Sequence, residues 1–294
     1  MNSKTVFFIV GPDFSGTTML DLMLSSLPNT KSLGEIYANF WPTHTRHLSN
    51  KCACSNPDCS EWDFLQGSKK NDCIHELIFN HFNNLNFLVD SSKSLPWLIS
   101  AIKKLSAHNI NYKVVFIYKD IDNYIDSCFK RGVKNPVKKW TEYSLAFLSL
   151  GQEFYPISLS QILDSPDDTL SSLCTFLDIN FLPSMKDYQN NIHHTFFGSA
   201  TARLQLHSDG STELKQTLST SLRSDFVSDY SFSSEYVSNN TSSYFFQRFS
   251  DQVEDFIFQV SIPSSLQMFL FKFFYFKSFL KLNFARILFF FKLS

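Results

Sequence analysis

The sequence predicts an α/β protein in which a central parallel sheet is flanked by helices on both faces, giving three layers. Short apolar segments typical of strands alternate along the chain with longer segments whose apolar residues recur at helical spacing. The strand segments are apolar throughout, as expected for parallel strands buried on both faces. Helices between successive strands supply the crossover connections that a parallel sheet needs.

The first elements are a strand, a turn and a helix. Residues 4–10 are short, β-branched and aromatic, and Gly11 ends them, which predicts a buried strand. Residues 15–27 place apolar side chains at helical spacing, and Pro28 follows the end of this helix. Residues 86–90 then predict a second apolar strand.

The alternation of helices and strands continues through the middle of the chain. Residues 95–107 predict a helix with Pro96 near its first turn, a favoured position for proline. Residues 112–118 give the strongest strand signal of the sequence. A helix is expected over 122–131, and Gly132 ends it.

The remaining elements and the change of composition after them define the expected domains. Residues 156–159 predict a weak strand, and 166–178 predict a helix with acidic residues in its first turn. We therefore expect one folded domain over 1–205. Ser, Thr, Asn and Asp dominate the next stretch, so 206–262 is expected to form loops or a linker, followed by a Phe-rich helical tail at 263–294.

Length, composition and charge exclude several classes of function. The chain has 294 residues, of which 44% are hydrophobic and 18% charged, which is enough apolar material for a substantial core. The net charge of −1 gives no global basic field, so we expect no nucleic-acid partner. No apolar stretch reaches 18 uncharged residues and the amino terminus lacks a signal-peptide pattern, so we expect a cytoplasmic protein.

The segment 7–20, FFIVGPDFSGTTML, predicts an anion-binding turn between a strand and a helix. The first N–H groups of a helix have no internal partner and the helix dipole adds positive charge there, so phosphate or sulfate is favoured. Gly11 allows the sharp turn, and Gly16 allows the backbone to approach a ligand closely. The side chains that add hydroxyl donors are Ser15, Thr17 and Thr18.

The same turn differs from a nucleotide-hydrolysing loop at one position. Such loops carry a lysine directly after the second glycine, where this chain has Thr17, and residues 5–30 contain no basic residue. Binding of β- and γ-phosphates with magnesium is therefore disfavoured, which argues against a small-molecule kinase. On this segment alone, an ordinary strand–helix turn with two glycines stays open.

Seven segments between residues 5 and 205 carry a family resemblance. They are GPDFSGTTMLDLML (11–24), LGEIYANFW (33–41), CACSNPDCSEW (52–62), LVDSSKSLPWL (88–98), YKDIDNYIDS (118–127), LSQILDSPDDTLSSLCTFLDI (159–179) and HHTFFGSATAR (193–203). In this order they resemble sulfotransferases that use 3′-phosphoadenosine 5′-phosphosulfate (PAPS), and in particular the bacterial or carbohydrate-type branch.

The resemblance implies a P-loop-like fold, PAPS as co-substrate, no metal, and transfer of a sulfuryl group to a hydroxyl of a carbohydrate, lipid or small metabolite. It implies Glu35 as the catalytic base. Lys93 follows the end of a predicted strand, where open α/β sheets place their ligands, and we assign it a catalytic role as well. The residues expected to bind PAPS are Gly11, Ser15, Gly16, Thr17, Thr18, Lys119, Ser127 and Arg203.

Two departures from the family pattern affect the expected chemistry. Phe14 stands at the basic position of the family's loop and cannot offset charge on the leaving phosphate. Either Lys93 supplies that charge, or the protein binds PAPS or a nucleotide without turnover. Lys119 replaces an arginine, so it keeps a point charge for the 3′-phosphate but loses the bidentate fork.

Two further groups of residues are considered for the site. Alternative bases are His44, His47, His193 and His194. Cys52, Cys54 and Cys59 lie close together, with Cys73 further on, but this spacing departs from the paired C-x₂₋₄-C units of zinc sites. A disulfide or free thiols are therefore preferred to a metal.

The carboxyl-terminal tail is very apolar but contains five basic residues. Peripheral attachment to a membrane through this tail is one hypothesis, with the cations contacting anionic lipid. A helix packed on the domain or on a partner is the other, because the cations only partly gather on one helical face. The basic residues are Lys272, Lys277, Lys281, Arg286 and Lys292.

Overall fold

The computed structural model describes most of the expected folded domain. The described residues are 4–40, 52, 54, 56–69, 71–196 and 198. The expected linker at 206–262, the tail at 263–294, and the candidates Arg203, His44 and His47 lie outside them. Among the described residues, none of the helices combines the length and apolar composition that a membrane-spanning segment requires.

A five-stranded parallel sheet forms the centre of the domain, with its strands in the order β2-β3-β1-β4-β5. The strands are β1 (Thr5–Val10), β2 (Thr30–Gly34), β3 (Phe87–Asp90), β4 (Asn111–Tyr118) and β5 (Tyr155–Ser158). The first strand of the chain is the central one, since Thr5 is in register with Phe87 of β3 on one side and with Asn111 of β4 on the other. The predicted α/β fold with a central parallel sheet is therefore confirmed.

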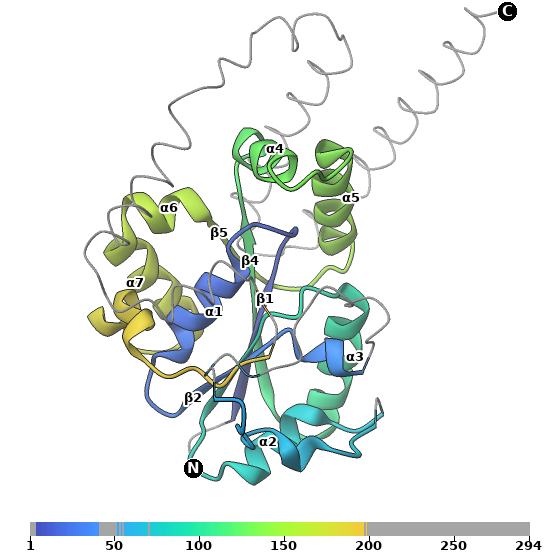
Figure 1. Cartoon of the computed structure of the whole chain (residues 1–294), viewed down its shortest axis with the longest axis vertical. Coiled ribbons are helices and arrows are strands. Elements are labelled where there is room, and N and C mark those ends of the chain that lie inside the picture. The colour runs from blue at the N-terminus through green and yellow to red at the C-terminus, as the bar shows by residue number, and fades with distance from the viewer. Residues whose placement is uncertain are drawn as a thin grey trace, which may run out of the picture.

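Helices cover both faces of this sheet (Figure 1). One face carries α1 (Thr17–Ser25), α6 (Leu159–Asp164) and α7 (Pro166–Leu177). The other face carries α2 (Ile74–His81), α3 (Leu95–Ala107), α4 (Ile121–Phe129) and α5 (Pro136–Leu148). Short 3₁₀ helices are η1 (Ile36–Asn39), η3 (Asp63–Leu65) and η4 (Pro183–Asn190).

The alternation of side chains along β1 divides the core into two halves. Val6, Phe8 and Val10 pack with α2, α3 and α5, whereas Phe7 and Ile9 pack with α1 and α7. All six residues of β1 are buried. Burial on both faces explains why the strand is apolar at nearly every position rather than at every second one.

The elements that the sequence did not predict are β2, α2, α5 and α6. The edge strand β2 has the sequence TKSLG, which contains no apolar run. Its Lys31 lies on the edge of the sheet, pairs with Glu61 and places its ammonium 4.2 Å from the ring centroid of Phe82. Tertiary contacts of this kind stabilise a strand whose local sequence does not favour one.

Candidate functional site

Four of the predicted site residues follow the carboxyl ends of four neighbouring strands. Glu35 follows β2, Lys93 lies three residues after β3, Gly11 follows β1 and Lys119 follows β4. Because the carboxyl ends of parallel strands meet at one edge of a sheet, the fold brings these residues to the region where open α/β sheets bind ligands.

The turn between β1 and α1 has the geometry of an anion-binding loop. A side chain at Gly11 is excluded, since a Cβ there would lie 2.0 Å from the carbonyl oxygen of Ile117. Gly16 precedes the helix with a φ of 93°, in the left-handed region that favours glycine. Thr17 and Thr18 form the first turn of α1, and both are buried.

The hydroxyl group of Ser15 is a candidate contact for a ligand in this turn. It is fully buried, and it has no hydrogen-bond partner among the residues that the structure describes. A buried hydroxyl without a partner costs free energy, so such a group calls for an explanation. An oxygen of a phosphate or sulfate bound at the start of α1 would provide the missing partner.

Phe14 adopts a left-handed backbone conformation with a φ of 66°, and its side chain is partly exposed. The guanidinium carbon of Arg131 lies 4.7 Å from the centroid of the Phe14 ring, a cation–π contact. Arg131 therefore stacks on Phe14, the residue that stands where the sulfotransferases resembled by the sequence carry a basic residue. Sequence reasoning missed Arg131, because no pattern near this residue relates it to the loop.

Lys119 and Arg131 converge on Ser127 of α4. The Lys119 ammonium donates to the Ser127 hydroxyl at 2.8 Å, and the Arg131 guanidinium donates to the Ser127 carbonyl at 2.8 Å. Burial, together with the nearby charge of Arg131, lowers the pKa of Lys119 to about 8. Neither cation forms an ion pair with a carboxylate in the described part of the chain. Two adjacent cations without a carboxylate partner are arranged to receive an anion.

Lys93 and Glu35 form a buried ion pair with an Nζ–Oε1 distance of 2.8 Å. The same ammonium lies 3.6 Å from a carboxylate oxygen of Asp13, which belongs to the anion-binding turn. Burial lowers the pKa of Lys93, but the two carboxylates outweigh this effect and raise it above its usual value. Lys93 therefore stays charged at neutral pH, between the turn and Glu35.

The hydroxyl of Tyr143 connects the two turns. It donates to the carbonyl oxygen of Lys93 at 2.6 Å and accepts a hydrogen bond from the Gly11 N–H at 3.2 Å. Tyr143 belongs to α5, a helix that the sequence did not predict, so this residue was not among the expected site residues. Lys93 itself has a φ of 59°, a strained conformation for a residue with a side chain, and the Tyr143 bond helps to fix it.

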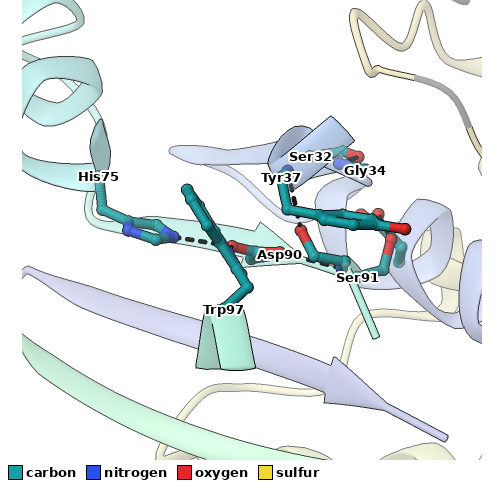
Figure 2. A network of polar contacts seen from close by, with 9 residues as sticks. Ser32, Gly34, Tyr37, His75, Asp90, Ser91 and Trp97 are labelled. Atoms are coloured by element: carbon teal, nitrogen blue, oxygen red, sulfur yellow. Dashed lines mark hydrogen bonds and ion pairs between the residues drawn. The ribbon is translucent and has the colours of Figure 1, made fainter. Parts of the chain in front are cut away.

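A polar network around Asp90 holds the end of β3 (Figure 2). One carboxylate oxygen of Asp90 lies 2.8 Å from the His75 ring nitrogen and accepts from the Trp97 indole N–H at 2.9 Å. The other oxygen accepts from the Ser92 N–H at 3.0 Å, and the Ser92 hydroxyl accepts from the Tyr37 N–H at 3.3 Å. This network orders the turn that carries the candidate lysine and joins it to η1.

Asp21 of α1 is a second buried carboxyl group near this network. It accepts a hydrogen bond from the Ser91 hydroxyl at 2.6 Å, while its other oxygen has no partner within the described ranges. Burial raises the pKa of Asp21 to about 7, although the bond from Ser91 acts in the opposite direction. Asp21 links α1 to the end of β3.

The segment 193–196 packs against the turn that carries Glu35. The Glu35 N–H donates to the carbonyl oxygen of Phe196 at 3.2 Å. The Ser32 hydroxyl donates to the Thr195 hydroxyl at 2.6 Å. His193 contacts the Ser25 hydroxyl with one ring nitrogen and the Tyr188 carbonyl with the other. Both nitrogens of His193 are thus engaged in structural contacts, which removes it as an alternative base.

A depression of about 830 Å³ lies at the opposite, amino-terminal edge of the sheet. Its lining includes Asn86, Asn109, Asn111 and Asp178. None of the predicted site residues lines it, and the chemistry described above lies at the carboxyl edge.

Comparisons with known proteins give no match in sequence and several in structure. No protein-family model matches the chain, and no curated protein matches it significantly. The structure is similar to the sulfotransferase domain of the Synechococcus PCC 7002 olefin synthase, with a TM-score of 0.47 and 15% identity over 89% of this chain and 97% of that one.

Two further sulfotransferase structures are similar to the chain. One is the sulfotransferase domain from the curacin biosynthetic pathway, with a TM-score of 0.46 and 16% identity over 69% of this chain and 83% of that one. The other is a sulfotransferase from Alicyclobacillus acidocaldarius, with a TM-score of 0.39 and 16% identity over 63% of this chain and 87% of that one. Because all three TM-scores lie below 0.5, we derive function from the geometry of the site itself.

Replacing Tyr143 by phenylalanine tests the link between the two turns. We expect Tyr143→Phe to lower the free energy of unfolding by about 1–3 kcal/mol, because a buried carbonyl and a buried N–H both lose their partner. Urea denaturation at neutral pH measures the change. Tyr112→Phe is the matched control, since among the described residues the half-buried Tyr112 hydroxyl bonds the side chain of Gln152 alone. Equal losses in the two variants would contradict the role given to Tyr143.

Proposed function

We propose that the protein transfers a sulfuryl group from PAPS to a hydroxyl group of an acceptor. The observation that carries this proposal is that two neighbouring groups at the carboxyl edge of the sheet are each suited to hold an anion. The first is the turn with the unpartnered Ser15 hydroxyl, and the second is the Lys119–Arg131 pair. The stacking of Arg131 on Phe14 supports the inference that the two sites adjoin.

The number of anion sites favours PAPS over a nucleoside triphosphate. PAPS carries a 5′-phosphosulfate and a 3′-phosphate, one group for each site. A nucleoside triphosphate places its anionic groups in a single chain, and its usual loop requires a lysine at the position of Thr17. The Lys119–Arg131 pair has no role in that arrangement.

The transfer step follows from the Lys93–Glu35 pair. The acceptor oxygen attacks sulfur while the bond from sulfur to the 5′-phosphate oxygen breaks, so negative charge develops on that oxygen and the acceptor loses a proton. Glu35 accepts the proton, and Lys93 donates a hydrogen bond to the departing oxygen. Protonation of Glu35 neutralises its carboxylate and weakens the ion pair with Lys93, so the Lys93 ammonium is then available to the leaving group.

The loss of the loop cation at Phe14 is offset by two other residues in this proposal. Lys93 approaches the turn at Asp13, and Arg131 lies over the Phe14 ring. The second candidate function is PAPS binding without turnover, and Phe14 itself is the observation that favours it. The acceptor is a hydroxyl-bearing carbohydrate, lipid or small metabolite.

Ligand-dependent stability distinguishes PAPS binding from kinase activity. We expect adenosine 3′,5′-bisphosphate to raise the melting temperature of the full chain, by an amount equivalent to about 2.7 kcal/mol at a hundredfold excess over its Kd. Adenosine 5′-monophosphate, which lacks the 3′-phosphate, should have a smaller effect, and Mg-ATP should have none. Stabilisation by Mg-ATP equal to that by the bisphosphate would favour a kinase instead.

The pH dependence of bisphosphate binding tests Lys119. Its pKa of about 8 means that the side chain is charged below this pH and loses its proton above it. We expect the affinity for adenosine 3′,5′-bisphosphate, measured by calorimetry, to fall about tenfold from roughly pH 7 to roughly pH 9. Lys119→Arg should bind well and remove this dependence, since arginine stays charged throughout. An unchanged dependence in Lys119→Arg would assign the titration to another group.

Two substitutions test the transfer step, with ³⁵S-labelled PAPS and a panel of acceptors. We expect Glu35→Gln to reduce turnover by about 10²–10⁴-fold through loss of the base. Lys93→Met should reduce it by about 10²–10³-fold through loss of charge stabilisation. Glu35→Gln should retain bisphosphate affinity, which separates catalysis from binding.

The matched control for these variants is Lys113→Met. Lys113 pairs with Asp178 at the opposite edge of the sheet, 3.0 Å away, and should leave turnover unchanged. Full activity in either Glu35→Gln or Lys93→Met would remove that residue from its role. Tight bisphosphate binding with no transfer to any acceptor by the unmodified protein would support binding without turnover.

A further inference from the structure

Three thiols and one imidazole meet on the side of the domain next to the Glu35 turn. One side-chain atom each of Cys52, Cys54, Cys59 and His194 lies within 4.8 Å of all the others. We call this group the Cys₃His cluster. The Nδ1 atom of His194 is 3.5 Å from the sulfur of Cys52 and 3.4 Å from that of Cys59. None of the three cysteines forms a disulfide, and all four side chains are partly buried.

We propose that the Cys₃His cluster binds one Zn²⁺ ion in a structural site. Three cysteines and one histidine are an established ligand set for closed tetrahedral zinc sites. Zinc with Zn–S bonds of about 2.3 Å and a Zn–N bond of about 2.0 Å holds sulfur and nitrogen roughly 3.5 Å apart. The two distances from His194 agree with this separation. With four protein ligands the coordination is complete, so the ion has a structural role rather than a catalytic one.

This inference departs from the expectation drawn from the cysteine spacing, which favoured a disulfide or free thiols. The spacing was uninformative because the fourth ligand is far away in sequence, 135 residues after Cys59. A disulfide would use two of the thiols and leave the third and His194 without a function. The structure instead gathers all four donors around one point.

The cluster joins two segments that both reach the candidate site. Cys52 forms an isolated antiparallel bridge with Phe196, which forms a parallel bridge with Gly34 at the end of β2. The rings of Trp62 and Phe196 lie 4.7 Å apart between their centroids. Because the Phe196 carbonyl accepts from the Glu35 N–H, zinc would fix the turn that carries this carboxylate. The metal site is inferred independently of the reaction proposed above.

A second group with donor atoms close together consists of Cys73, Glu76 and His108. It offers three ligands, and two of these already form an ion pair, with a distance of 2.9 Å between His108 Nδ1 and Glu76. We do not assign a metal to this group. It supplies a control for the Cys₃His cluster.

Metal analysis of the full chain, purified with a reductant and without chelator, tests the proposal. We expect about one zinc per chain. Loss of an outer-shell partner alone weakens metal binding about 10–100-fold, so Cys54→Ser and His194→Asn, which remove direct ligands, should weaken it by more than about 100-fold. The controls Cys73→Ala and His81→Asn should retain zinc, because these residues lie outside the cluster.

Cobalt substitution gives a readout that does not depend on how well the variants fold. Co²⁺ in the unmodified chain should show the intense visible bands of tetrahedral coordination and thiolate-to-metal charge transfer, and added zinc should abolish them. A protein that contains no zinc and takes up no cobalt overturns the proposal. Loss of metal in Cys73→Ala also overturns it. So does a disulfide between any two of Cys52, Cys54 and Cys59, found by mass spectrometry of the reductant-purified protein. None of these measurements uses sulfuryl transfer, so a negative result leaves the proposed reaction standing.

Discussion

The buried ion pair between Lys93 and Glu35 is the interaction on which the organisation of the site depends. Taking two charges largely out of water is costly, and the cost is offset only while the two groups stay together and well oriented. The surrounding structure meets this need from several directions. Tyr143 holds the backbone of Lys93, the Asp90 network orders the preceding residues, and the Phe196 carbonyl receives the Glu35 N–H. These contacts fix the backbone on both sides of the pair.

The positive charge at this site comes from positions around the anion-binding turn and not from the turn itself. Phe14 offers an aromatic face where the family's loop offers a cation, and Arg131 stacks on that face. Lys93 approaches from the end of β3, and Lys119 from the end of β4. Electrostatic stabilisation depends on where charge is placed in space. Neighbouring strands can therefore supply the charge that the turn lacks.

The sequence predicted the fold, because strands and helices have local patterns that can be recognised. Apolar runs identified β1, β3 and β4, and the rule that ligands bind at strand ends made Lys93 a candidate, which the structure places beside Glu35. The strand β2 was missed because its sequence has no strand pattern, and tertiary contacts stabilise it instead. Arg131 and Tyr143 were missed for a related reason, and so was the metal-binding role that we propose for His194. Each acts through a contact with a residue distant in the chain, as in the bond between Tyr143 and Gly11, 132 residues apart.

The position of β1 in the middle of the sheet has a consequence for biosynthesis. This strand is synthesised before its two neighbours in the sheet, β3 and β4, whose pairing residues begin at Phe87 and Asn111. Until both have been made, the run VFFIV has two unpaired edges and two uncovered apolar faces. Such a segment is prone to aggregation, and pairing over long stretches of chain is slow. We therefore expect this run to be most exposed to wrong contacts between the synthesis of β1 and that of β4.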